Sequence, residues 1–99
     1  MTITKNQNGD TTTLIVDGRL DTNTSPEMQA AILDAFKVTK NLVLDLEKVV
    51  YVSSAGLRAL LIGQKTASSK GGKMEVIHVA PTVKSVLDSV GFSAILNIR

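Results

Sequence analysis

The chain has 99 residues, enough for one domain with a single hydrophobic core. Its net charge is +2, its acidic and basic residues are interspersed, and only three residues are aromatic, so it lacks the basic stripe and the stacking platform of a nucleic-acid-binding protein. Because cysteine is absent, disulfides, thiol chemistry and cysteine-ligated metals are excluded. No apolar run approaches the roughly 20 residues that span a bilayer, so we expect a cytoplasmic domain without membrane insertion.

The first two segments are predicted to form an antiparallel hairpin. Residues 1–7 and 11–17 have strand-like patterns, and Asn8 and Gly9 between them favour a tight turn. Residues 18–24 then leave the sheet as a polar loop. Asp21 in this loop has two interpretations: a turn residue that accepts main-chain hydrogen bonds, or part of a binding surface.

A first helix is predicted from Ser25 to about Val38. Ser25 is the expected N-cap and Pro26 the first helical residue, a position where proline loses no helical hydrogen bond. The residues expected to face the core are Met28, Ile32, Leu33 (or Ala31) and Phe36.

The middle of the chain carries the most distinctive pattern. Residues 41–46 (NLVLDL) read as a buried central strand, and residues 49–52 (VVYV) as the end of a buried strand segment. Two serines and a leucine-rich helical pattern follow, which predicts a helix over residues 54–69. A serine at such a point is typically the N-cap, at the positive end of the helix dipole where an added phosphate is stabilised. A cap with no further role is the common alternative.

The last third of the chain continues the alternation of strand and helix. Residues 74–79 are predicted as a strand, Pro81 begins a helix that ends at Gly91, and residues 92–99 are an expected edge strand. The order is β-β-α-β-α-β-α-β, an α/β fold with a mixed sheet of four to five strands and right-handed crossovers between its parallel strands. The residues of the third helix expected to face inward are Val83, Val86, Leu87 and Val90.

No catalytic or metal-binding constellation is recognisable. The only histidine, His78, is expected to be a half-buried strand residue, and no second histidine or cysteine completes a metal site. A triad of Ser54, His78 and Asp21 lacks the Gly-x-Ser-x-Gly turn. We therefore expect a non-enzymatic protein without cofactor or metal.

Four separated motifs, in order, resemble the STAS domain of bacterial anti-sigma-factor antagonists and sulfate transporters. They are Gly18–Asp21, Asn41–Leu46, Tyr51–Arg58 and Val90–Phe92. The resemblance implies a single STAS domain over residues 1–99. In this family an unphosphorylated antagonist binds an anti-sigma factor that is also a serine kinase of the GHKL type. Phosphorylation of the antagonist breaks the complex, and a PP2C-type phosphatase resets it.

The resemblance also implies the site. Aligned on Gly56, Ser54 occupies the phosphorylation position, Ser53 stands where the family has an aspartate, and Ala55 replaces a hydroxyl residue. Ser53 is a second candidate acceptor. The acceptor hydroxyl is expected to cap an exposed helix end, with Arg58 on the same outward face. The expected partner-binding residues are Asp21, Thr22, Asn23, Thr24, Ser53, Ser54, Ala55, Gly56, Arg58, Ala59 and Ile62.

Several alternatives remain open at this stage. The small residues of the second helix, Ala59 and Gly63 among them, either receive a partner helix or pack against a neighbouring helix of the same domain. The chain is either a phosphorylated antagonist or a STAS accessory subunit, never phosphorylated, of an ABC transport assembly for lipids. A small hydrolase that uses Ser54 is the third hypothesis.

Overall fold

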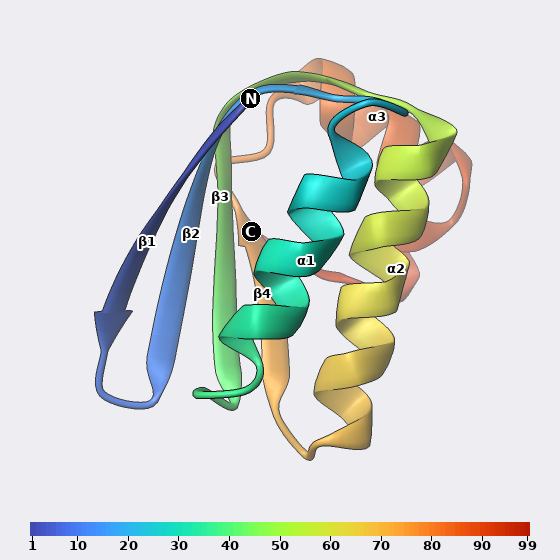
Figure 1. The fold of residues 1–99 in the computed structure, drawn as a ribbon. Coiled ribbons are helices and arrows are strands. Elements are labelled where there is room, and N and C mark those ends of the chain that lie inside the picture. Colours follow the sequence, from blue (N-terminus) through green and yellow to red (C-terminus); the bar gives the residue numbers. More distant parts are fainter.

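The computed structural model describes all residues, 1–99, and its elements follow the predicted order (Figure 1). The strands are β1 (Thr2–Asn8), β2 (Thr11–Leu20), β3 (Asn41–Val52), β4 (Lys73–Ile77) and β5 (Asn97–Ile98). The helices are α1 (Ser25–Ala35), α2 (Ser54–Ser69) and α3 (Pro81–Ser89), with a 3-10 turn at Phe92–Ala94. None of the helices combines the length and apolar character needed to cross a membrane.

The five strands form one mixed sheet in the order β1-β2-β3-β4-β5. β1 is antiparallel to β2, and all later neighbours are parallel. The carboxyl ends of β2, β3 and β4 therefore lie along one edge, and the loops that follow them are brought together there. The main-chain N–H of Ser53, after β3, donates to the carbonyl of Leu20, at the end of β2, over 2.8 Å.

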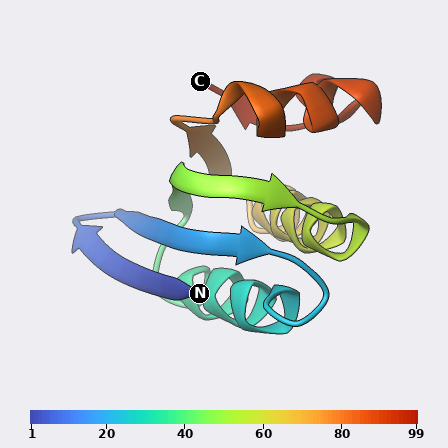
Figure 2. The same ribbon diagram turned by 90° about the horizontal axis from the view of Figure 1, so that it is seen from above.

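The helices cover one face of this sheet, and the other face is left without a helix (Figure 2). In β3 the side chains of Leu42, Leu44 and Leu46 are buried, whereas Val43 and Asp45 between them are only partly buried. α1, α2 and α3 contribute to the same core cluster as these leucines. The alternation expected of a strand with one covered face is thus present in β3.

β3 is one strand rather than the two segments that the sequence suggested. The register between β2 and β3 shifts between Ile15 and Asp17 and again between Gly18 and Leu20, and at each shift β3 accommodates one extra residue as a bulge. Because pairing resumes beyond each shift, β2 also runs to Leu20 instead of ending near residue 17. The expectation that residues 49–52 are all buried is wrong, since Val50 and Tyr51 are exposed.

The bounds of the helices differ from the prediction by a few residues. α1 ends at Ala35, and its N-cap is Thr24 rather than Ser25, whose buried side chain follows as the first helical residue. α3 ends at Ser89, so Val90 lies outside the helix and is 49% exposed instead of facing the core. β4 ends at Ile77, and His78 is an exposed residue with φ 55°, not a half-buried strand residue.

Candidate functional site

The two serines at the start of α2 have different roles. Ser53 is the N-cap, with extended backbone, and its hydroxyl oxygen accepts a hydrogen bond from the N–H of Gly56 at 3.4 Å. Ser54 is the first helical residue and is exposed. The expectation that the acceptor hydroxyl at Ser54 caps the helix is therefore wrong, because the cap lies one residue earlier. Ser54 still lies within the first turn, where main-chain N–H groups lack helical partners.

The start of α2 is fixed against the end of β2. Gly56 is buried there, and a Cβ added to it would lie 2.8 Å from the carbonyl oxygen of Leu20 and 3.0 Å from the side chain of Val52. A glycine is therefore needed at this contact. The close approach sets the direction in which the first turn of α2 leaves the sheet, and with it the exposure of Ser54.

The loop between β2 and α1 is held by Asp21. Its Oδ1 accepts hydrogen bonds from the N–H of Asn23 at 2.9 Å and from the N–H of Thr24 at 3.1 Å. The Thr24 hydroxyl in turn donates to the carbonyl of Arg19 at 2.6 Å. The hydrogen bond from the Thr24 amide is the main cause of a lowered Asp21 pKa, with the Asn23 amide and the Arg19 charge also contributing. The turn interpretation of Asp21 is confirmed.

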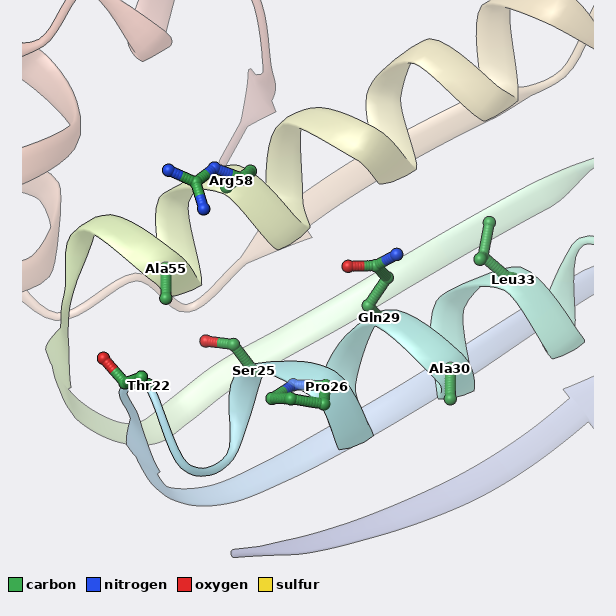
Figure 3. Close-up of a pocket in the computed structure, with 8 residues that line it drawn as sticks. All are labelled: Thr22, Ser25, Pro26, Gln29, Ala30, Leu33, Ala55 and Arg58. Atoms are coloured by element: carbon green, nitrogen blue, oxygen red, sulfur yellow. The ribbon is translucent and has the colours of Figure 1, made fainter.

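A groove of about 390 Å³ lies between α1 and the first turns of α2 (Figure 3). Arg58 is its only charged lining residue, and Ser54 lies one turn before Arg58 on α2 and directly before Ala55. The side chains that line the groove are Thr22, Ser25, Pro26, Gln29, Ala30, Leu33, Ala55 and Arg58.

The structure gathers only part of the expected partner-binding set at this groove. Thr22, Ala55 and Arg58 line it. Asp21 and Thr24 instead make the hydrogen bonds that hold the loop between β2 and α1, and Asn23 is exposed next to Thr22.

Two expected partner-binding residues are corrected, because Gly56 and Ala59 are buried inside the domain. Ile62 is half-buried. Gly63 is buried as well: a Cβ there would meet the sulfur of Met74 at 2.7 Å and a methyl of Ile32 in α1 at 3.0 Å. At Ala59 and Gly63 the small-residue face of α2 therefore packs inside the domain instead of receiving a partner helix.

The sequence interpretation missed the contribution of α1 to the groove. Pro26, Gln29, Ala30 and Leu33 form its α1 wall. Leu33 was assigned to the core, but it is only half-buried. An apolar residue next to the buried Ile32 is the one signal that would have pointed to this wall.

An exposed apolar surface adjoins the two serines. Val50 and Tyr51 near the end of β3 are 65% and 42% exposed, and the Arg19 guanidinium lies 4.3 Å from the centre of the Tyr51 ring. Val50 and Tyr51 lie at a second shift in register, between the pairs Gly18–Val49 and Leu20–Val52, and Val49 and Val52 on either side of them remain buried.

The hypothetical triad is not formed. The Nδ1 atom of His78 lies 3.1 Å from Oδ1 of Asp45, not beside Asp21. Asp21 accepts hydrogen bonds from main-chain N–H groups of its own loop.

Residues 2–99 match the family model of the STAS domain, and the chain belongs to this family. The chain is 32% identical over 85 residues to an anti-sigma F factor antagonist of Paenibacillus polymyxa, a match that covers 84% of this chain and 73% of that protein.

Solved structures show the same fold. An anti-sigma factor antagonist from Mycobacterium paratuberculosis superposes with a TM-score of 0.86 at 21% identity, covering 98% of this chain and 83% of that one. SpoIIAA is an anti-sigma factor antagonist and cell fate determinant of Bacillus. Its unphosphorylated form superposes with a TM-score of 0.79 and its phosphorylated form with a TM-score of 0.77, each at 16% identity. These matches cover 99% of this chain and 87% and 91% of those chains.

Proposed function

We propose that this protein is an anti-sigma-factor antagonist whose binding is controlled by phosphorylation of Ser54. The observation that carries the proposal is the exposed Ser54 side chain in the first turn of α2, beside the groove that ends at Arg58. The similarity to a Paenibacillus antagonist supports the same function. The STAS fold alone would not, since one fold serves many functions.

The proposed partner is an anti-sigma factor that is also a GHKL-type serine kinase. It docks over the start of α2, where the groove offers a shallow apolar surface with a single positive charge at Arg58. Val50 and Tyr51, shortly before the serines in the chain, are also exposed, and aromatic residues such as Tyr51 are enriched at protein interfaces.

Ser54 is a better acceptor than Ser53. The Ser53 hydroxyl is half-buried and already accepts the hydrogen bond of the Gly56 amide. A phosphoryl group on Ser53 would remove the cap, whereas Ser54 is exposed and no hydrogen bond engages its hydroxyl in the structure.

Phosphorylation would release the partner without refolding the domain. A phosphoserine at position 54 carries almost two negative charges, which the amides at the start of α2 stabilise in the free protein. In a complementary interface the same charge is desolvated without a partner of its own, at a cost of several kcal/mol. That cost lowers affinity by orders of magnitude.

A PP2C-type phosphatase would complete the cycle, because the exposed phosphoserine stays accessible in the free protein. In this proposal the chain itself is a non-enzymatic binding module. Its only histidine, His78, is paired with Asp45 and in this proposal does not act as a general base for Ser54.

The test is phosphorylation by a cognate GHKL-type kinase with ATP, followed by intact-mass analysis. We expect one added phosphoryl group on the wild-type chain and none on Ser54→Ala. Ser53→Ala is the matched control and should still be phosphorylated. If the wild-type chain takes up no phosphate, or Ser54→Ala takes up as much, the proposal is wrong. Co-purification with the ATPase subunit of a transporter would then favour the accessory-subunit alternative.

A further inference from the structure

Three potential metal ligands meet where the middle of β3 lies beside the carboxyl end of β4, separate from the groove. They are Asp45 and Glu47 of β3 and His78, the residue after β4. One ligand atom from each lies within 4.8 Å of the other two. The expectation of no metal site rested on the single histidine and the absence of cysteine, and carboxylates brought in by a neighbouring strand were not part of it.

The sheet register brings these residues together. Asp45 is in register with Ile77 in the parallel pair of β3 and β4, so His78 lies one residue beyond the partner of Asp45. The left-handed backbone of His78, with φ 55°, takes the chain out of the strand at this point. The imidazole Nδ1 then lies 3.1 Å from Oδ1 of Asp45.

The Asp45 carboxylate is fixed in place. Its Oδ1 accepts the main-chain N–H of Glu47 at 3.1 Å, and its side chain is only 16% exposed. The imidazole of His78 is more open, at 58%. Glu47 is exposed, so its side chain is free to turn toward the other two ligands. Asp45 and His78 are therefore already in contact, and a ligand atom of Glu47 lies within 4.8 Å of both.

We propose that Asp45, Glu47 and His78 bind a divalent transition-metal ion of the Zn²⁺ type. Zinc binds nitrogen and oxygen ligands at about 2.0–2.2 Å, so two ligands of a tetrahedral site are roughly 3.3–3.5 Å apart. The separation of 3.1 Å between His78 and Asp45 is close to this value. Imidazole suits Zn²⁺, Co²⁺ and Ni²⁺, whereas Mg²⁺ and Ca²⁺ prefer oxygen ligands alone. Three protein ligands leave a fourth position open to solvent.

The experiment is a titration of the full chain, free of any purification tag, with Zn²⁺ by calorimetry and with Co²⁺ by visible absorption. Three variants remove one ligand each: His78→Asn, Asp45→Asn and Glu47→Gln. Asparagine is chosen at position 78 because it tolerates left-handed backbone. The matched control is Glu75→Gln, a carboxylate of β4 outside the cluster that pairs with Arg99 at 2.7 Å.

We expect one Zn²⁺ per wild-type chain and an affinity at least about tenfold lower in His78→Asn and Asp45→Asn. Glu75→Gln should bind as the wild type does. NMR of the wild-type chain gives a readout that needs no variant: Zn²⁺ should shift the amide signals of residues 45–47 and 78 first. The proposal is overturned if the wild type binds no Zn²⁺, if His78→Asn binds it equally well, or if the shifts cluster elsewhere.

Discussion

The neighbouring residues Ser53 and Ser54 have different structural roles. Ser53 completes the backbone hydrogen bonding of α2, and Ser54 is left free on the surface. The sequence motif identifies the pair but cannot assign the tasks, because a shift of the helix start by one residue exchanges them. Only the hydrogen bond from Gly56 to Ser53 resolves the assignment.

This assignment makes a prediction for stability. Ser53→Ala removes the N-cap and should lower the free energy of unfolding by about 1 kcal/mol. Ser54→Ala is the matched control and should change it by less than about 0.5 kcal/mol, because the side chain is exposed. Urea unfolding followed by circular dichroism measures both. Equal losses in the two variants would contradict the assignment of the cap.

Asp21 makes a prediction for pH dependence. Its pKa is lowered in the folded state, chiefly by the hydrogen bond from the Thr24 amide, so the folded protein favours the ionised form. The resulting stabilisation is complete above the ordinary carboxyl pKa and is lost as the pH falls through the lowered value. Asp21→Ala should therefore unfold at a lower temperature than the wild type at pH 7, and the difference should shrink toward about pH 3.

Asp34 provides the control for this experiment. It is an exposed acid whose ion pair with Lys37, at 3.2 Å, lies on the surface, so Asp34→Ala should hardly change the melting temperature. A difference between Asp21→Ala and wild type that stays constant from pH 7 to pH 3 would show that the ionised carboxylate does not hold the loop.

Among the elements, the docking of α2 on β2 decides where the candidate site lies. Gly56→Ala places a methyl group 2.8 Å from the Leu20 carbonyl, a main-chain atom that cannot move alone. We expect a loss of about 1–3 kcal/mol in the free energy of unfolding. Gly63→Ala is the informative comparison: its methyl mainly meets the flexible side chain of Met74, so the loss should be smaller. A larger loss at Gly63 would argue against this account of the contact.

The order and type of the elements could be predicted because hydrophobic periodicity records which face of each element is buried. The hairpin and the three helices lie within a few residues of where the pattern placed them. The edge strand expected over residues 92–99 is wrong in extent, because Phe92–Ala94 form a 3-10 turn and only Asn97–Ile98 pair with β4. The bulge in β3 could not be predicted. Glu47 and Lys48 looked like a connection between two strands, yet they continue one strand across a shift in register.

The candidate site was predictable only in part for the same reason. Residues near the motif, such as Ser54, Ala55 and Arg58, were identified from sequence alone. The α1 wall of the groove and the meeting of His78 with Asp45 depend on contacts between distant elements. Gly56 and Ala59 were assigned to the surface because a helical pattern does not distinguish a face that meets a partner from one that meets a neighbouring helix.

At the scale of the whole molecule, the proposed function needs a domain that keeps its fold while its surface changes charge at one residue, Ser54. The helix start is anchored by Gly56 and Ser53, so a phosphoryl group on the exposed Ser54 has no need to disturb the core.

The most direct test compares the binding of the unphosphorylated and the Ser54-phosphorylated chain to the kinase that modifies it. Calorimetry without ATP measures the affinity, and amide NMR spectra of the two free forms report on the fold. We predict that phosphorylation weakens binding at least about a hundredfold, while shifts of the amide signals stay confined to the start of α2. Equal affinity of the two forms, or a loss of affinity accompanied by shifts throughout the sheet, would contradict the account.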